Sequence, residues 1–513
     1  MKEIKDKWSI GDIGSIAIFT LIPLVACLIM CVKDGIGIAD VYLANSRWND
    51  EAFYYKMIGA VDRYGQPLGY FGYNGSTARI GHFGPWSPAL FVFYMLYAKL
   101  FGWSLISPIY CNIMLMAIAM GVFALLTRPN KRQICSVFFL YCSCTIITRY
   151  VFSNMSEISI YALLIIYLGI AIKMLRQEEK HNICFEIILN IITFILVLMR
   201  PYWLLLTVLP GFYWFSRSNK KLIVVFESAW SVFGLAMYFF INQYFCAAYY
   251  KSIINFEWLE LIFEDISQGI YNMMHIFISS LWEILQYAGE GVINGSPVGS
   301  IYALYILVIL YFIYLYRKCQ GDDKTRKFCV CYFLFYLCAM LVAIIYLYDI
   351  NVGSRHATGF IFLFIFIISI MVKSKKHFVL FLGFYAWLLC IRATDQYTYQ
   401  IPVYTEAKEM ILAKGRADLA DKGLIDINSN NPWDNTLIWL YADETTVDFT
   451  HLYAVPDGMG IELYFKDSVL KEFDMLKPKY IMTNIGEEID LLCKYEGKEI
   501  MAEYGNVHIW QLR

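Results

Sequence analysis

The sequence predicts an all-α polytopic membrane protein that carries a small soluble α/β domain at its C-terminal end. Of the 513 residues, 59% are hydrophobic and 17% are charged, with a mean hydropathy of +0.51. Soluble domains contain about 25% charged residues, so this composition indicates a chain folded mainly in lipid. Near Ala393 the content of Asp, Lys, Asn and Gly increases. We therefore expect a transmembrane domain over 1–394 and an extracytoplasmic domain over 395–513.

Apolar stretches long enough to cross a bilayer recur about eleven times. They lie at 13–33, 106–127, 134–153, 158–175, 183–200, 202–216, 222–246, 301–317, 328–348, 359–373 and 377–394. Basic residues cluster in alternate connections, as in "TRPNKRQ" and "YRKCQGDDKTRK". With the N-terminus in the cytoplasm and the first span uncleaved, every basic cluster is cytoplasmic, as the positive-inside rule requires. The same topology places the C-terminal domain outside.

Two long connections are expected on the outer side, at 33–105 and 247–300. Counting the apolar helix at 85–102 as a span would put "TRPNKRQ" outside, so we interpret it as a juxtamembrane helix. The segment 247–300 is acidic and moderately apolar, and it contains either no crossing or two. Interfacial helices are the favoured interpretation.

The stretch "SRWNDEAFYYKMI" predicts a further juxtamembrane helix that begins near Asp50. Phe53, Met57 and Ala60 recur at helical spacing, so we expect this apolar face to rest on the bilayer surface. Asp50, Glu51 and Lys56 should then face elsewhere. An ionised carboxylate is favoured near a helix N-terminus, which suits a general base.

Polar groups inside a span need an explanation, since a charge at mid-bilayer costs about 2.5–3.5 kcal/mol on insertion scales. Glu186 and Glu227 lie near the cytoplasmic ends of their spans, where we expect the side chains to reach the interface. Other ionisable residues fall at the outer ends of several elements: Asp50, Glu51, His82, Arg149, Glu157, Arg200, Arg355 and His356. Acids and bases on one membrane face are what an outward-facing active site needs.

The C-terminal segment alternates short apolar stretches with helical ones. "NTLIWLYA", "PKYIMTNI" and the terminal "NVHIWQLR" predict strands, and "YTEAKEMILAKG" predicts a helix. This pattern is the basis for the predicted α/β domain.

The outer-loop residues also resemble a known family. "WNDEAFYYKMIGAVDRYGQPLGYF" and "HFGPWSPALFVFYMLYAKLFGW" resemble the first outer loop of GT-C glycosyltransferases, in particular the protein mannosyltransferase and aminoarabinose transferase branch. "RYVFSNMSEISIYALLIIYL", "LMRPYWLLL" and "GSRHATGFIFLFI" are similar to later family motifs, in the same order over roughly 10–395. The Lys of the family's "KPP" signature is missing, and His82, Phe83 and Gly84 lie nearby. The third-span acid is Glu157, where many relatives carry Asp.

The resemblance implies an inverting membrane glycosyltransferase that moves a sugar from a polyprenyl-phosphate carrier, such as undecaprenyl phosphate, to a glycan, lipid or protein acceptor. Transfer would occur on the non-cytoplasmic face of a bacterial cell envelope. In this interpretation Asp50 is the base, Glu51 assists it, and Glu157 orients the acceptor or holds Arg149. The remaining implied roles are lipid-phosphate binding by Arg355, His356, Arg200 and Arg149, and sugar or acceptor contact by Tyr54, Tyr55, His82 and Trp86.

The implied partners are the lipid-linked sugar, the acceptor and membrane lipids, with no nucleic acid. No cofactor is implied with certainty and a divalent cation stays open, because the missing Lys removes support for the metal site of some relatives.

Two other functions stay open. A lipid-linked oligosaccharide flippase or transporter would more typically show internal repeats, broken helices in corresponding halves, and polar residues near the midplane. A surface-polysaccharide polymerase would place its key residues in the central outer loop 247–300, which contains few Arg and His. Structural roles also stay open: interface snorkelling for Arg149, helix capping for Arg200, lipid contact for Arg355 and His356, and packing for His82.

Overall fold

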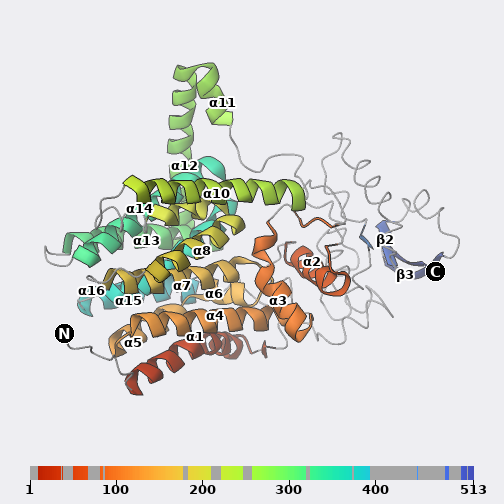
Figure 1. Cartoon of the computed structure of the whole chain (residues 1–513), viewed down its shortest axis with the longest axis horizontal. Coiled ribbons are helices and arrows are strands. Elements are labelled where there is room, and N and C mark those ends of the chain that lie inside the picture. Colours follow the sequence, from red (N-terminus) through yellow and green to blue (C-terminus); the bar gives the residue numbers. More distant parts are fainter. Residues whose placement is uncertain are drawn as a thin grey trace.

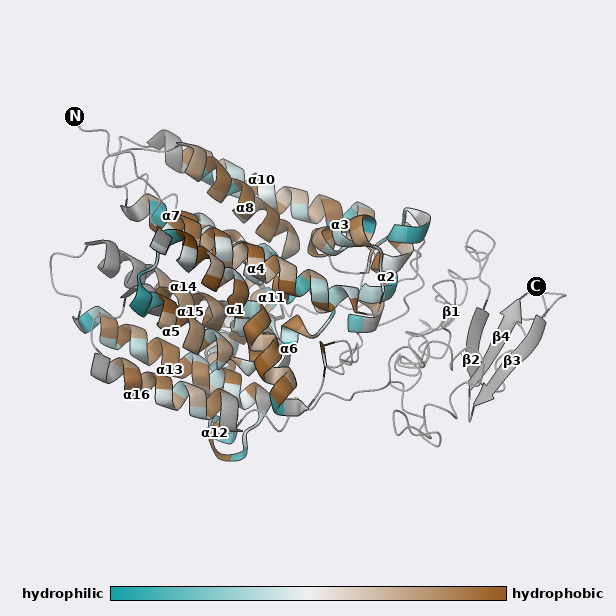
Figure 2. Cartoon of the chain, turned by 90° about the horizontal axis from the view of Figure 1, so that it is seen from below, coloured by the Kyte–Doolittle hydropathy of each residue, from teal (hydrophilic) through white to brown (hydrophobic). Residues whose placement is uncertain are grey.

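The computed structural model describes most of the first 392 residues and four strands of the C-terminal segment. The described ranges are 10–35, 37–38, 50–67, 81–84, 87–104, 106–176, 183–208, 221–246, 257–318, 324–371, 375–392, 447–448, 480–484, 498–504 and 507–512. Over the first 392 residues the described structure is almost entirely helical (Figure 1). Hydrophobic residues cover the helices of this bundle, and hydrophilic residues gather towards helix ends (Figure 2).

The helices follow one another along the chain. In order they are α1 (Ile10–Asp34), α2 (Asp50–Tyr64), η3 (Pro88–Leu90), α3 (Val92–Phe101), α4 (Ser107–Thr127), α5 (Lys131–Cys142), α6 (Thr145–Val151), α7 (Glu157–Arg176), α8 (Ile183–Met199), η4 (Pro201–Thr207), α10 (Lys221–Phe245), α11 (Glu257–Glu264), α12 (Ile266–Asn294), α13 (Pro297–Lys318), α14 (Lys324–Leu347), α15 (Ile350–Met371), α16 (Lys375–Ala386) and the π-helix η5 (Trp387–Arg392). Proline starts η3, η4 and α13, where its missing N–H removes no helical hydrogen bond.

Five described helices are long and apolar enough to cross a membrane: α1, α4, α7, α10 and α13. Helices α5 and α6 together make a sixth candidate, but they are bent by 70° at a break between Cys142 and Thr145. Five shorter apolar helical stretches of 10–17 described residues lie in α3, α8, α14, α15 and across α16 and η5. The chain is thus a multi-pass helical membrane protein, and the count of eleven crossings stays a prediction.

Two predicted spans differ in form from the expectation. The span predicted at 134–153 is the bent pair α5 and α6 and not one straight helix. The span predicted at 202–216 begins as the 3₁₀-helix η4, because Arg200 has an extended backbone that ends α8 and Pro201 restarts the chain in tighter turns. Its second half lies outside the described residues.

Helices α7 and α15 form the centre of the bundle. The stretch from Ala357 to Ile367 is buried along its whole length, and most of α7 is buried as well. Gly169 of α7 lies against α4, where an added Cβ would come within 3.3 Å of the Cα of Phe123. Phe123 in turn contacts Phe366 of α15 with ring centroids 4.9 Å apart.

Helix α2 is covered by protein, so the expectation that its apolar face rests on the bilayer is wrong. Every residue from Tyr54 to Ala60 is buried, and the side chains of Glu51 and Lys56 are fully buried as well. Aromatic side chains provide much of the cover: the Tyr54 ring lies 4.8 Å from that of Phe91, and the Tyr55 ring stacks 5.6 Å from that of Trp103.

Helix α3, within the predicted juxtamembrane segment 85–102, carries the exposed apolar stripe instead. Val92, Leu96 and Leu100 follow one another at four-residue spacing and are 49–66% exposed. Tyr94 and Ala98 on another face are buried against the protein. This division fits a helix that lies along a membrane surface.

The prediction for Glu186 and Glu227 is also wrong, because neither side chain reaches solvent. Glu186 on α8 and Glu227 on α10 are 6% and 5% exposed. The amide Nδ2 of Asn190 donates a hydrogen bond of 3.0 Å to Oε1 of Glu227, and the two carboxylates are close enough to interact electrostatically. The Asn190 amide thus gives the buried Glu227 carboxyl group a hydrogen-bond partner between α8 and α10.

Four strands of the C-terminal segment form one sheet in the order β1-β2-β4-β3. They are β1 (Val447–Asp448), β2 (Tyr480–Asn484), β3 (Lys498–Tyr504) and β4 (Val507–Leu512). β1 and β2 are parallel, and the other pairings are antiparallel. β2 and β4 lie within two of the predicted strand segments. The helix predicted at 404–415 and the strand at 435–442 lie outside the described residues, so the α/β domain stays a prediction.

Candidate functional site

The N-terminus of α2 is tied to the loop that precedes α7. Nδ2 of Asn154 donates a hydrogen bond of 3.1 Å to the backbone carbonyl of Glu51, and both residues are buried. Asp50 begins α2, and its side chain lies outside the described residues. Because α7 begins at Glu157, three residues after Asn154, two acidic helix N-termini lie close together. Each N-terminus favours an ionised carboxylate through its unpaired N–H groups.

One asparagine of α4 holds this loop in place. Nδ2 of Asn112 donates to the carbonyls of Tyr150, Val151 and Ser153 at 2.7–3.3 Å. Its Oδ1 accepts a hydrogen bond of 2.6 Å from the hydroxyl of Tyr94, which also donates to the carbonyl of Met155. A fully buried amide with both ends bonded fixes the turn between α6 and α7, because any movement would break several buried hydrogen bonds at once.

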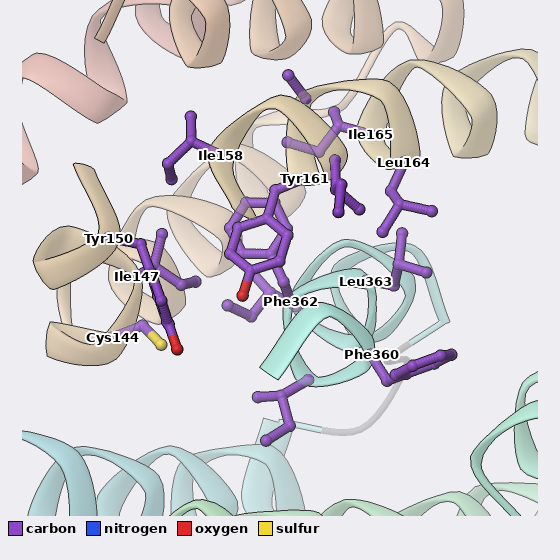
Figure 3. Close-up of a cluster of buried hydrophobic side chains, with 14 of the residues drawn as sticks. Cys144, Ile147, Tyr150, Ile158, Tyr161, Leu164, Ile165, Phe360, Phe362 and Leu363 are labelled. Atoms are coloured by element: carbon purple, nitrogen blue, oxygen red, sulfur yellow. The ribbon is translucent and has the colours of Figure 1, made fainter. Parts of the chain in front are cut away.

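Tyr161 connects the start of α7 with α15. It lies one turn after Glu157, and its ring stacks on Phe362 at 5.2 Å while meeting Tyr150 edge-on at 6.0 Å (Figure 3). Its hydroxyl is close enough to the Glu157 carboxylate for an electrostatic interaction. Gly359 makes this contact close: a Cβ there would lie 3.3 Å from Tyr161 and 3.4 Å from Trp203 of η4.

A histidine and an arginine lie near these aromatic side chains. The hydroxyl of Tyr202 and Nδ1 of His356 are 3.0 Å apart, and the ring of Tyr348 lies 4.5 Å from the His356 ring. Arg200 is buried at the start of η4, and it interacts electrostatically with Tyr238 of α10. η4 therefore brings Tyr202 against α15 at His356, while Arg200, two residues earlier, lies near Tyr238 of α10.

Acidic and basic helix ends lie at the same end of the bundle. Tyr161 contacts α15 at Gly359 and Phe362, and further along both helices Gly169 and Phe366 meet Phe123 of α4. From the first of these contacts to the second, the residue numbers increase along both α7 and α15. The two helices are therefore parallel. Their first turns, with Glu157 and with Arg355 and His356, therefore share one end with the N-terminus of α2. The side chain of Arg355 lies outside the described residues.

The other predicted contact residues are more scattered. Tyr54 and Tyr55 are buried by Phe91 and Trp103, so they support α2 and do not line an open surface. His82 is half-buried in a segment that lies between α2 and α10, because the N–H of Phe83 donates to the carbonyl of Phe245 and Gly84 contacts Met57. Arg149 is half-buried in the last turn of α6. Trp86 lies outside the described residues.

Sequence reasoning missed several residues of this region. Asn112 carries a recognisable signal, since it is an amide within the apolar stretch "YCNIMLMAIAM". Asn154 lay inside a quoted motif without an assigned role. Tyr161, Tyr202 and Tyr348 carry no distinguishing signal among 40 tyrosines.

Several polar atoms here have no hydrogen-bond partner among the described residues, although their residues are buried. They are Oδ1 of Asn154, Oγ of Ser156, the hydroxyl of Tyr161 and Nε1 of Trp203. Buried polar atoms are normally bonded, so a group of such atoms is typical of a site that receives polar groups from a ligand.

In the described part of the chain, no three His, Cys, Asp or Glu side chains lie together so that they could hold a metal ion. The region offers carboxylates, a guanidinium, an imidazole and several hydroxyls for binding and proton transfer.

Comparisons of the chain with protein-family models, curated proteins and solved structures give no match.

Proposed function

We propose that the protein is a membrane glycosyltransferase of GT-C type that uses a polyprenyl-phosphate-linked sugar on the non-cytoplasmic face. The observation that carries the proposal is the convergence of acidic helix starts (α2 and α7) with Arg200, Tyr202 and His356 at one end of an apolar bundle. A donor with a lipid tail requires both features together: helices for the tail and polar groups at their ends for the phosphate and the sugar.

In the proposed reaction the acceptor hydroxyl oxygen attacks the anomeric carbon, and the bond from that carbon to the phosphate oxygen breaks. Asp50 takes the hydroxyl proton, and the phosphate leaves with the bonding electron pair. Glu157 orients the acceptor. His356, held by Tyr202, and Arg200 stabilise the negative charge of the leaving phosphate, with Arg355 as a further donor. A positioned base accelerates such a step by about 10²–10⁴-fold.

The proposed topology has eleven crossings, a cytoplasmic N-terminus and an extracytoplasmic C-terminal domain. It is supported by the ends of the described helices. The basic residues near Lys131, Arg176, Lys221, Arg317 and Lys375 all fall at helix ends that alternate with the site end along the chain.

The experiment is complementation of a deletion strain with the wild-type chain, with Asp50→Asn and with Asp265→Asn. Asp265 is a matched control, since it also begins a helix and its N-cap role is retained by Asn. We expect Asp50→Asn to lose the surface sugar, detected by mass spectrometry of cell-surface glycans, at unchanged protein levels. Asp265→Asn should restore it. Wild-type glycans with Asp50→Asn would exclude Asp50 as the base.

A further inference from the structure

The helical hairpin formed by α11 and α12 has a feature that sugar transfer does not explain. α12 is 29 residues long, and many of its largest apolar side chains are exposed, among them Ile278 and Trp282 at 62% and 63%. The hairpin rises from the bundle at a steep angle to α1, α4 and α10 (Figure 1). Among the described helices α12 is not one of the candidate spans.

Contacts with two neighbouring helices fix the hairpin beside the C-terminal end of α14 and the N-terminal end of α13. Tyr346 in the last turn of α14 accepts the indole N–H of Trp258 on its carbonyl at 3.2 Å and donates its hydroxyl to the carbonyl of Met273 at 3.1 Å. α12 then turns into α13 at Gly295, and Gly291 lies against Gly299 so closely that a Cβ would come within 2.1 Å of the Gly299 carbonyl carbon. α12 therefore lies where α14 ends and α13 begins.

Residues around α12 divide into three faces, since successive residues of an α-helix are offset by about 100°. The first face packs on the protein and contains Gly269, Met273, Ile284, Ala288 and Gly291. The second is exposed and apolar and contains Met274, Ile278 and Leu285. The third is exposed and polar and contains Gln268, His275, Ser279, Glu283, Gln286 and Glu290. The centres of the faces are about 120° apart.

The two exposed aromatic residues lie on the border between the apolar and polar faces. Tyr271 and Trp282 follow the apolar face on the side of His275 and Ser279, and both are more than 60% exposed. Tyr and Trp favour the boundary between hydrocarbon and water, because each combines an apolar ring with one polar atom. The order of apolar, aromatic and polar residues around the helix matches the order of hydrocarbon, interface and water at a bilayer surface.

The charges of the hairpin fit a neutral membrane surface. Residues 257–300 contain six acidic residues and no Lys or Arg. Asp265 at the turn accepts hydrogen bonds from the side chain and backbone of Ser267 and from the backbone of Gln268, which lower its pKa and keep it charged. An acidic segment without basic residues does not bind anionic headgroups through charge, so apolar contact must provide the attachment.

We infer that α12 lies in the outer membrane interface beside α13 and α14, with its exposed apolar face on the acyl chains of neutral lipids and its polar face in water. The lipid bilayer is thus the partner of this face, and the hairpin enlarges the contact of the protein with one leaflet. This inference does not depend on the proposed sugar transfer.

The test is photo-crosslinking in intact membranes of the full chain. A benzophenone amino acid is placed at Ile278 or Leu285 on the apolar face, and at Ser279 or Gln286 on the polar face as matched controls. All four positions are exposed, so none of the substitutions disturbs packing. We expect lipid adducts, identified by mass spectrometry, at Ile278 and Leu285, and none above background at Ser279 and Gln286.

Two results would overturn the inference. Crosslinking of Ile278 to a second copy or to another protein would show that a protein covers this face. Equal lipid adducts at Ile278 and Ser279, or none at either, would show that the faces are not divided between lipid and water.

Discussion

At the scale of single residues, the most constrained group near the site is the amide of Asn112. It lies inside an apolar helix and is fully buried, yet both its Nδ2 and its Oδ1 form hydrogen bonds. Its partners are the carbonyls that shape the turn before Glu157. The cost of placing an amide in this helix is offset by those bonds, and the result is a fixed position for the start of α7.

Replacing Asn112 by Leu should destabilise the protein strongly. Leu has a similar volume, but it removes the amide donor from the Val151 and Ser153 carbonyls, and each buried polar group left unpaired costs about 1–3 kcal/mol. Tyr94 keeps its bond to Met155, and the Tyr150 carbonyl keeps its bond from Ser153. The measurement is thermal unfolding of the purified protein in detergent. Asn294→Leu on the exposed end of α12 is the control, with an expected effect within about 0.5 kcal/mol. Equal midpoints for both variants would contradict the role of Asn112.

Replacing Tyr202 by Phe should weaken binding of the lipid phosphate without unfolding the protein. The ring contact with His356 is kept, but the hydrogen bond to Nδ1 is lost. Such a bond contributes about 0.5–1.5 kcal/mol, so we expect roughly a 2- to 10-fold lower affinity for polyprenyl phosphate. Binding titrations with the purified lipid check this value, and Tyr110→Phe on an exposed part of α4 serves as the control. If Tyr202→Phe bound polyprenyl phosphate with unchanged affinity, His356 would not be part of the phosphate site.

At the scale of elements, the close contact between α12 and α13 depends on one of two neighbouring glycines in α12. Gly291 of α12 touches the backbone of Gly299, whereas a Cβ at Gly289 would meet nothing within 4 Å. These contacts hold α12 against α13 at the turn between them, and so fix the position of the α11 and α12 hairpin relative to α13. Sequence patterns do not distinguish the two glycines, because each is surrounded by similar residues.

Gly291→Ala should therefore separate α12 from α13, while Gly289→Ala should be tolerated. In the first case the methyl group overlaps backbone atoms that cannot move independently. In the second, Ala improves helix propensity by about 0.8–1.0 kcal/mol relative to Gly. Thermal unfolding in detergent measures both, with a lowered midpoint expected for Gly291→Ala and a raised or equal one for Gly289→Ala. A lowered midpoint for Gly289→Ala alone would be incompatible with this packing.

The pairing of α8 with α10 provides a second test at this scale. Asn190 donates to Glu227 between the two helices, and a typical hydrogen bond contributes about 0.5–1.5 kcal/mol. A double-mutant cycle with Asn190→Ala and Glu227→Gln should give a coupling energy of at least about 0.5 kcal/mol from unfolding measurements. Additive effects would mean that the two side chains act independently.

At the scale of the whole molecule, hydrophobic content and span length predicted a multi-pass helical protein, and the structure agrees with that prediction. The same patterns did not predict that α2 is enclosed by aromatic residues, because Phe91 and Trp103 come from other parts of the chain. They also failed for Glu186 and Glu227, since hydropathy along one helix does not report a polar neighbour on another. For the site, the charged residues could be found at helix ends, whereas Asn112, Tyr161 and Tyr202 depend on tertiary contacts.

The proposed sugar transfer requires that the end of the bundle carrying Asp50, Glu157, Arg200 and His356 faces the non-cytoplasmic side. The most direct measurement is labelling of intact cells with a membrane-impermeant maleimide, comparing Gln66→Cys just after α2 with Lys131→Cys at the start of α5, against the wild-type background. Both native side chains are exposed. We expect Gln66→Cys to be labelled in intact cells and Lys131→Cys only after permeabilisation. The reverse pattern, or labelling of both from outside, would contradict it.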